Sequence, residues 1–175
     1  MIGREIPLEL EWIPFEVHPE IPPEGKLLTD MFPGTIFEKF YRRLARESGV
    51  PELPFGHAER LDNSGLALEA AEFAKETPVF DFFHDNLFRA HFFEEKNISR
   101  LQTVLDIAAA SGLDTTALEV ALKSRKYAPQ VDTYKDMACG QGINGVPTFI
   151  INNAYRLVGT QPLEDFRSLL KRFNN

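Results

Sequence analysis

The chain can carry out thiol chemistry at one position only, because Cys139 is its single cysteine. A lone thiolate can attack a disulfide and form a mixed disulfide, but release of the product needs a second thiol within reach. Free cysteines mostly serve as small, partly buried apolar residues. We therefore expect Cys139, near the end of a predicted helix and beside Gly140, to be structural. One cysteine also excludes an intrachain disulfide and a zinc site built on thiolates.

Two histidines and a glutamate offer a second kind of chemistry. His84 and His91 lie in a phenylalanine-rich stretch, and Glu95 follows four residues after His91. On one continuous helix the three side chains would share a face and could bind a metal ion. Metal sites usually draw ligands from several elements, and histidines among phenylalanines commonly pack as half-buried amphipathic side chains. We therefore expect no metal and no cofactor here.

A proline is the third candidate. The run INGVPTFIINN, residues 143–153, reads like a buried strand but carries Gly145, Val146 and Pro147 at its head. Proline has no N–H group and stays out of sheet interiors, so here it marks a turn or the start of a strand. A cis Val146–Pro147 bond would fit that geometry, although cis bonds are uncommon before proline.

The elements that follow Pro147 are a predicted hairpin and a helix. Residues 148–151 and 155–159 are short β-rich runs, joined by the turn-forming residues 152–154. After Pro162, apolar residues recur at helical spacing, at Leu163, Phe166, Leu169, Leu170 and Phe173. We therefore expect a β-hairpin covered by an amphipathic helix.

A strand and a series of helices are predicted before the hairpin. Leu8, Leu10 and Trp12 alternate with Glu9 and Glu11, which is typical of a strand, and a proline-rich loop follows. Capping and breaking residues then predict helices from Thr35 to Gly49, from Ser64, from Thr77 as N-cap with Pro78 at N1, from Ser99 to Gly112, from Asp114, and from about Pro129 to Gly140. This order predicts an α+β protein.

Composition narrows the function classes. The net charge of −7 argues against nucleic acid and anionic membranes as partners, because both require a basic face. No apolar stretch approaches the about 20 residues of a spanning helix, and residues 1–12 lack the order of a signal peptide. We therefore expect a cytoplasmic protein. With 43% hydrophobic residues, the chain can bury a sizeable core as one domain or one domain with a large insertion.

Four blocks of the sequence resemble the FrnE-like branch of the DsbA family of thiol–disulfide oxidoreductases. They are EWIPFEVHPEIPPEG, LDNSGLALEAAEFAKE, FHDNLFRAHFFEEKNIS and GINGVPTFIINNAYRLVGTQPLEDF. The resemblance implies an α+β, thioredoxin-like fold of the DsbA type, with residues 1–33 and 143–175 in the thioredoxin-like part and residues 34–142 in a helical insertion domain. It also implies that Pro147 is cis and that Val146 and Pro147 contact the substrate, a polypeptide or a thiol such as glutathione.

The chain departs from the family at one point. In the family a first strand leads into C-x-x-C at a helix N-terminus, which lowers the pKa of the leading cysteine. This sequence has no C-x-x-C, and fewer residues precede Leu8 than the about 30 of a strand–helix–strand unit. We therefore expect a truncated chain that lacks the first βα unit and is redox-inactive as given. The strands at Leu8 and Thr148 would keep unpaired edges, which predicts a homodimer, a smaller closed sheet or low solubility.

Three functions follow from these observations. The first is a DsbA-like disulfide oxidoreductase whose N-terminal segment is absent from this chain. The second is a glutathione-dependent isomerase or kappa-type transferase relative, in which a serine takes the place of the leading cysteine. The third is a noncatalytic module that binds extended peptides through main-chain contacts.

Overall fold

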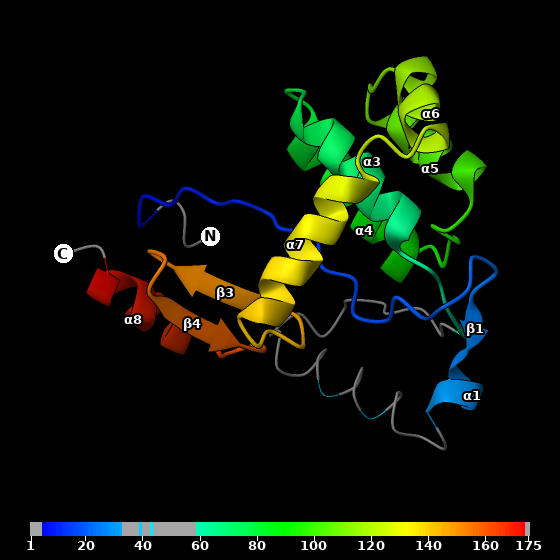
Figure 1. Ribbon diagram of the computed structural model, residues 1–175. Helices are drawn as coiled ribbons and strands as arrows, with labels where there is room; N and C mark the ends of the chain where they lie inside the picture. The colour runs from blue at the N-terminus through cyan, green and yellow to red at the C-terminus, as the bar shows by residue number, and fades with distance from the viewer. Residues whose placement is uncertain (1–4, 33–38, 40–42, 44–58, 174–175) are drawn as a thin grey trace.

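The structure is a computed structural model that describes residues 5–32, 39, 43 and 59–173 (Figure 1). Helices α3 to α6 gather at one end of the molecule, the hairpin β3–β4 and α8 lie at the other, and α7 runs between them (Figure 1). The elements in chain order are β1 (Lys26–Leu27), α1 (Leu28–Met31), β2 (Arg60–Leu61), α3 (Gly65–Lys75), α4 (Phe80–Phe92), α5 (Leu101–Ala110), α6 (Thr115–Lys123), α7 (Ala128–Gly140), β3 (Thr148–Ile151), β4 (Tyr155–Val158) and α8 (Leu163–Phe173). The predicted α+β fold class is confirmed.

Local signals placed most helix ends correctly. The Asp114 side chain accepts a hydrogen bond from the Ala117 N–H at 3.0 Å and so caps α6. Gly112 adopts φ 81° just after α5, a conformation that glycine reaches without strain. The N-terminus of α4 differs from the prediction, because the Thr77 hydroxyl donates to the Ala74 carbonyl and closes α3 instead. Helix α4 begins at Phe80. The helix predicted from Thr35 to Gly49 lies almost entirely outside the described residues.

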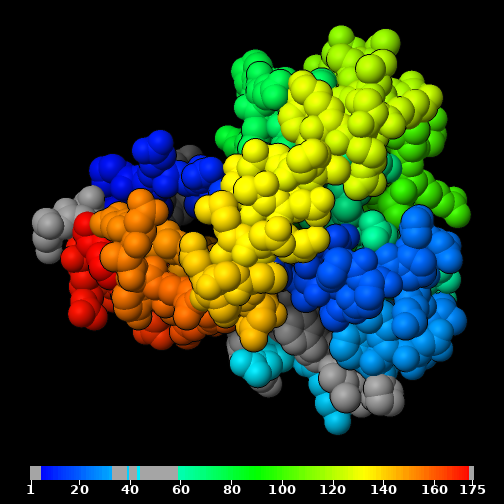
Figure 2. All heavy atoms as spheres, in the orientation of Figure 1, coloured from blue at the N-terminus to red at the C-terminus, as the bar shows by residue number. Residues whose placement is uncertain are grey.

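The strand predicted at Leu8, Leu10 and Trp12 is wrong. The segment has no secondary structure, and the three side chains are 50%, 66% and 43% exposed. A strand needs a hydrogen-bonded neighbour, and within the described residues β3 pairs with β4 alone. The apolar and acidic residues alternate as they would in a strand, but no neighbouring strand among the described residues forms hydrogen bonds with them. Figure 2 shows this blue segment on the surface of the molecule.

The main core lies among the helices around α3. Helix α3 contacts α4, α5, α6 and α7. Its buried face is built from alanines at positions 67, 70 and 74, which let neighbouring helices approach closely, while Phe83, Val104 and Leu118 from those neighbours fill the space. Among the described helices, none is both long enough and apolar enough to cross a membrane.

The hairpin has its own smaller core. Antiparallel pairing sets Phe149 opposite Leu157 and Ile151 opposite Tyr155. Because side chains alternate across a strand, these four residues share one face, which α8 covers. The Phe149 and Phe166 ring centroids lie 4.9 Å apart. Asn152 and Asn153 have φ of 50° and 55°, which confirms the predicted turn chemistry.

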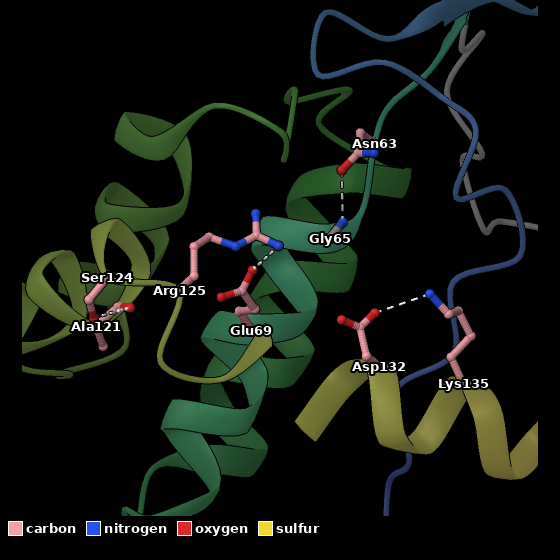
Figure 3. Close-up of polar contacts among 8 residues, drawn as sticks. All are labelled: Asn63, Gly65, Glu69, Ala121, Ser124, Arg125, Asp132 and Lys135. Atoms are coloured by element: carbon pink, nitrogen blue, oxygen red, sulfur yellow. Dashed lines mark hydrogen bonds and ion pairs between the residues drawn. The ribbon is translucent and has the colours of Figure 1, made fainter. Parts of the chain in front are cut away.

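A buried carboxylate lies between α3 and α7. The Glu69 side chain is 1% exposed, and its Oε1 lies 3.0 Å from Nη2 of Arg125, in the loop that precedes α7 (Figure 3). Burial raises the pKa of the Glu69 carboxyl, the negative charge of Asp132 raises it further, and Arg125 opposes both effects. The folded protein therefore holds a proton on Glu69 more tightly than the unfolded chain does.

Substitution of Phe83 should test the helical core. Phe83 is fully buried, whereas its neighbour Phe82 is 57% exposed. We expect Phe83→Ala to lower the free energy of unfolding by about 3–5 kcal/mol through lost burial and a residual cavity. Phe82→Ala is the matched control and should change it by about 0.5 kcal/mol. Urea unfolding of both variants gives the comparison, and equal losses would contradict this account of the core.

Glu69→Gln should remove the contribution of the Glu69 carboxyl to the pH dependence of the unfolding free energy. Since the folded-state pKa of Glu69 is raised, its contribution to stability is complete below the ordinary value of 4.5 and is lost as the pH rises through the folded-state value. Glutamine does not titrate. The unfolding free energy of the wild type minus that of the variant should therefore fall from pH 4 to pH 7.5. A difference that is constant or rises over this range would contradict the assignment.

Candidate functional site

The candidate site is the loop between α7 and β3, which contains Val146 and Pro147, the two residues for which the family resemblance implies substrate contact. Helix α7 ends at Gly140, and Gly142 turns the chain with φ of 68°. That backbone conformation favours glycine, since a β-carbon would strain it. The loop thus begins at the end of a helix anchored on α3 and ends at the first residue of β3.

Hydrogen bonds from the hairpin help to hold the loop in place, besides those from the N–H groups of Gly142 and Ile143 back to α7. The Thr148 hydroxyl donates to the Gly145 carbonyl at 2.7 Å, and the Gly159 N–H donates to the Pro147 carbonyl at 2.8 Å. The Arg156 guanidinium, on β4, donates to the carbonyl of Gln141. Both ends of the loop are therefore tied to the hairpin. The Val146–Pro147 peptide bond is cis.

Val146 precedes the cis bond in this loop, and its main-chain groups determine what the loop can bind. The residue is 57% exposed. Within the described part of the chain, no hydrogen bond engages its N–H or its carbonyl. An exposed N–H and C=O on one residue can pair with an extended peptide as a neighbouring strand would. The loop can therefore recognise a ligand by its main chain, independently of the ligand's side chains.

Cys139 lies one residue before the end of α7, close in sequence to the loop. Its side chain is exposed, so the expectation of a partly buried apolar residue is wrong. The outward position follows from the weak amphipathic pattern of α7, in which Val131 is the one buried residue. With a single cysteine in the sequence, the site still has only one thiol.

The histidines lie elsewhere and serve as packing residues. The His84 ring stacks on Trp12 and on Phe88, with centroids 4.4 and 4.7 Å apart, and burial lowers its pKa. His91 Nδ1 is 3.7 Å from Asp62 Oδ2. Helix α4 ends before Glu95, so the three residues do not share a helical face. The described residues contain no group of histidine, cysteine and carboxylate side chains that could hold a metal ion.

A shallow pocket between β4 and α8 was not predicted from the sequence. Its volume is about 260 Å³, and Tyr155, Gln161, Asp165 and Arg172 are among its lining residues. Tyr155 lies on β4, Gln161 in the loop after it, and Asp165 and Arg172 on α8, so the packing of α8 against the hairpin brings them together. Sequence spacing gives no signal for such a pocket.

Comparison with known proteins gives a family and a fold. The profile of the DSBA-like thioredoxin domain family matches residues 4–171. A relative in Bacillus subtilis (strain 168), the uncharacterized protein YwbO, is 30% identical over 152 residues, which cover 86% of this chain and 74% of YwbO.

Two solved structures share the fold. One is a probable DsbA oxidoreductase from Streptomyces coelicolor, with a TM-score of 0.78 and 21% identity over 90% of this chain and 72% of that chain. The other is the cytosolic disulfide reductase DsbM from Pseudomonas aeruginosa with GSH, with a TM-score of 0.61 and 18% identity over 85% of this chain and 80% of that chain.

Thr148→Val should loosen the loop while keeping the shape of the side chain. The variant removes the hydroxyl that bonds to the Gly145 carbonyl, an interaction worth about 1 kcal/mol, which corresponds to about fivefold in an opening equilibrium. We expect amide hydrogen exchange of residues 144–146 to speed up by about that factor. Thr133→Val is the matched control, because it removes a similar bond to the Pro129 carbonyl within α7. Unchanged exchange in Thr148→Val would show that this bond does not hold the loop.

Proposed function

Because this chain belongs to the DSBA-like thioredoxin domain family, we propose that it provides the substrate-binding loop of a thiol–disulfide oxidoreductase of the FrnE-like branch. The observation that carries the proposal is at Val146, beside Pro147 in the loop between α7 and β3: the residue is exposed, and among the described residues no hydrogen bond engages its main chain. Main-chain pairing suits polypeptide substrates of many sequences, because every residue offers the same groups. The fold neighbours, a DsbA oxidoreductase and a disulfide reductase, support this reaction class.

These 175 residues do not by themselves complete disulfide exchange. When a substrate disulfide is reduced, two electrons pass to it from two thiols, and those thiols join in a new disulfide. Attack by one thiolate breaks the substrate disulfide but leaves the protein joined to one half of it. The second thiol that would release this half is absent here, since Cys139 is the single cysteine. The chain is therefore redox-inactive as given, and a thiol pair has to come from outside these residues.

Glutathione is the second candidate ligand. The Pseudomonas disulfide reductase that shares the fold was solved with GSH and is described as cytosolic. Glutathione is a short extended peptide, so its main chain can pair with Val146 as a polypeptide would. In this version the protein is a glutathione-dependent isomerase or kappa-type transferase relative, and it works in the cytoplasm. A noncatalytic peptide-binding module is the third version, and it uses the same loop without any thiol.

Reduction of insulin disulfides by dithiothreitol tests the redox assignment. We expect the 175-residue chain to give no turnover above the rate with dithiothreitol alone, because the chain supplies one thiol and leaves the release of any mixed disulfide to dithiothreitol, which also reduces insulin directly. Cys139→Ala is the matched control and should behave as the wild type does. Turnover by the wild type that disappears in Cys139→Ala would overturn the assignment, since it would place the chemistry on Cys139.

The same assay separates the three versions when it is repeated on a chain extended at its N-terminus by the codons that precede Met1. Activity with an added C-x-x-C supports the oxidoreductase. A serine in that place, with glutathione shifting the NMR signals of residues 145–147, supports the glutathione-dependent relative. An in-frame stop before any such segment supports the noncatalytic module.

A further inference from the structure

Strand β4 has an outer edge, on the side that faces away from β3. Bonded and non-bonded pairs alternate along an antiparallel ladder. The Gly159 N–H donates to the Pro147 carbonyl, which makes this pair a bonded one. Stepping back along β4 from Gly159, Val158 and Arg156 therefore stand at non-bonded positions. Both residues direct their N–H and C=O groups away from β3, toward the outer edge.

This outer edge is independent of the first βα unit of the family. The strand of that unit would pair with the free side of β3, and β4 lies on the other side. Figure 1 shows β3 between the N-terminal segment and β4. Among the described residues β3 is the only strand that pairs with β4, and no hydrogen bond engages the main chain of Arg156 or Val158. Since Val158 is also 54% exposed, this edge is accessible with or without the first unit.

The shallow pocket between β4 and α8 lies beside this edge. All its lining residues come from β4, the loop after it and α8, so it is on the β4 side of the helix. Leu157, Phe166 and Leu169 are its apolar, half-buried members. Its volume of about 260 Å³ is below the range of about 300–1,000 Å³ that is usual for whole small-molecule ligands. The pocket therefore suits one large apolar side chain.

Helix α8 places opposite charges at the two ends of this pocket. The ring centroids of Tyr155 and Phe173 lie 5.4 Å apart, so the end of α8 lies beside the start of β4 and the two elements are antiparallel. Asp165, in the first turn of α8, is therefore near the end of β4, and Arg172, in the last turn, is near its start. Seven residues of helix separate the two charges by about 10 Å along the axis.

A strand that added to β4 in the antiparallel direction would place alternate side chains over the pocket. Its residues opposite Gly159, Leu157 and Tyr155, in that order, would point to the α8 face. The first would lie beside Asp165, the second over the apolar lining, and the third beside Arg172. The first and third residues are about 13 Å apart in a strand, which long charged side chains adapt to the spacing of about 10 Å on the helix.

We propose that the outer edge of β4 binds an extended segment of another polypeptide as an added antiparallel strand. In this segment a basic, an apolar and an acidic residue follow one another at every second position. The main chain of Arg156 and Val158 supplies the hydrogen bonds, and the pocket receives the apolar side chain. Asp165 and Arg172 select the order of the charges and so the direction of the added strand. The proposal does not rest on the proposed redox function.

A second copy of this chain fits the edge less well. Antiparallel pairing of two β4 strands around Leu157 would set Tyr155 of each copy opposite Gly159 of the other. A neutral tyrosine would then take the place of the basic residue beside Asp165. Two chains of net charge −7 also repel each other. A segment of another polypeptide is therefore the favoured occupant.

Three capped seven-residue peptides, with threonine at every odd position, are the probes. The first carries lysine, leucine and glutamate at its even positions, in that order, and the second exchanges the lysine and the glutamate. The third is the first peptide with methylated backbone nitrogens on the two threonines beside leucine. We expect the first peptide, at millimolar concentration, to give saturable NMR shifts and slower amide exchange at residues 156 and 158. The second should bind at least about fivefold more weakly because it brings like charges together, and the third should not bind because it lacks the donors that face β4.

Charge variants of the full chain test the direction of the added strand. Asp165→Arg combined with Arg172→Asp exchanges the two charged ends of the pocket, and it should make the second peptide the tighter ligand. Arg172→Gln alone should weaken binding of the first peptide about threefold, as expected for one exposed ion pair. Lys171→Gln is the matched control, because Lys171 is also a basic residue of the last turn of α8 but does not line the pocket. It should leave the affinity nearly unchanged.

A main-chain variant tests the ladder itself. Val158→Pro removes one outward N–H at an edge position, where proline is tolerated because that group bonds to no neighbouring strand. It should abolish binding of the first peptide while circular dichroism shows an unchanged fold.

The proposal fails if the first peptide gives no saturable change at millimolar concentration, if the two charge orders bind equally, or if the methylated peptide binds as well as the first. Slower amide exchange at residues 156 and 158 that grows with protein concentration in the absence of peptide would also reject it, because a second copy would then be the occupant.

Discussion

The close packing of α3 determines where everything else in this molecule can lie. Alanines at positions 67, 70 and 74 give α3 a face of small side chains. Helices α4, α5, α6 and α7 can therefore pack close to α3 and bury their larger side chains against it. One of these is α7, which crosses from the helical core to the hairpin (Figure 1). The candidate site begins where α7 ends. The helical core therefore fixes one end of the Val146 loop through α7, and the hairpin fixes the other end through β3.

The two attachments of the loop act in different ways. On the α7 side, a glycine at φ 68° and the bond from Arg156 to the Gln141 carbonyl set the direction in which the chain leaves the helix. On the strand side, the bond from Gly159 to the Pro147 carbonyl continues the β3–β4 ladder by one step. The ladder stops there, and Val146 is the first residue beyond it. Bonded and non-bonded pairs alternate along an antiparallel ladder, so the residue next to the Pro147–Gly159 pair stands at a position that β4 does not bond.

Sequence reasoning succeeded where neighbouring residues determine the structure. The cap at Asp114, the turn at Asn152 and Asn153 and the amphipathic pattern of α8 each depend on residues a few positions apart, and the structure confirms them. It failed where the partner is distant in sequence. The pattern from Leu8 to Trp12 is that of a strand, but a strand also requires a neighbour, which no local pattern reveals.

In the candidate site, too, the features set by neighbouring residues could be predicted, and those set by distant residues could not. Val146 and Pro147 could be selected from the sequence because glycine, proline and an apolar run mark the loop, and the resemblance to the family supplied a role for it. The openness of the Val146 main chain could not be predicted, since it depends on where the β3–β4 ladder ends. The exposure of Cys139 was likewise unpredictable, because α7 is packed along one stripe near Val131 and its last turn projects beyond the helical core.

The charges of the chain add a constraint on what its open main chain can bind. Backbone groups that have no partner among the described residues, such as those of Val146, would favour self-association in a neutral protein. A net charge of −7 opposes the approach of a second copy. The same charges attract cationic chains, so they discriminate between partners that the backbone alone would treat alike.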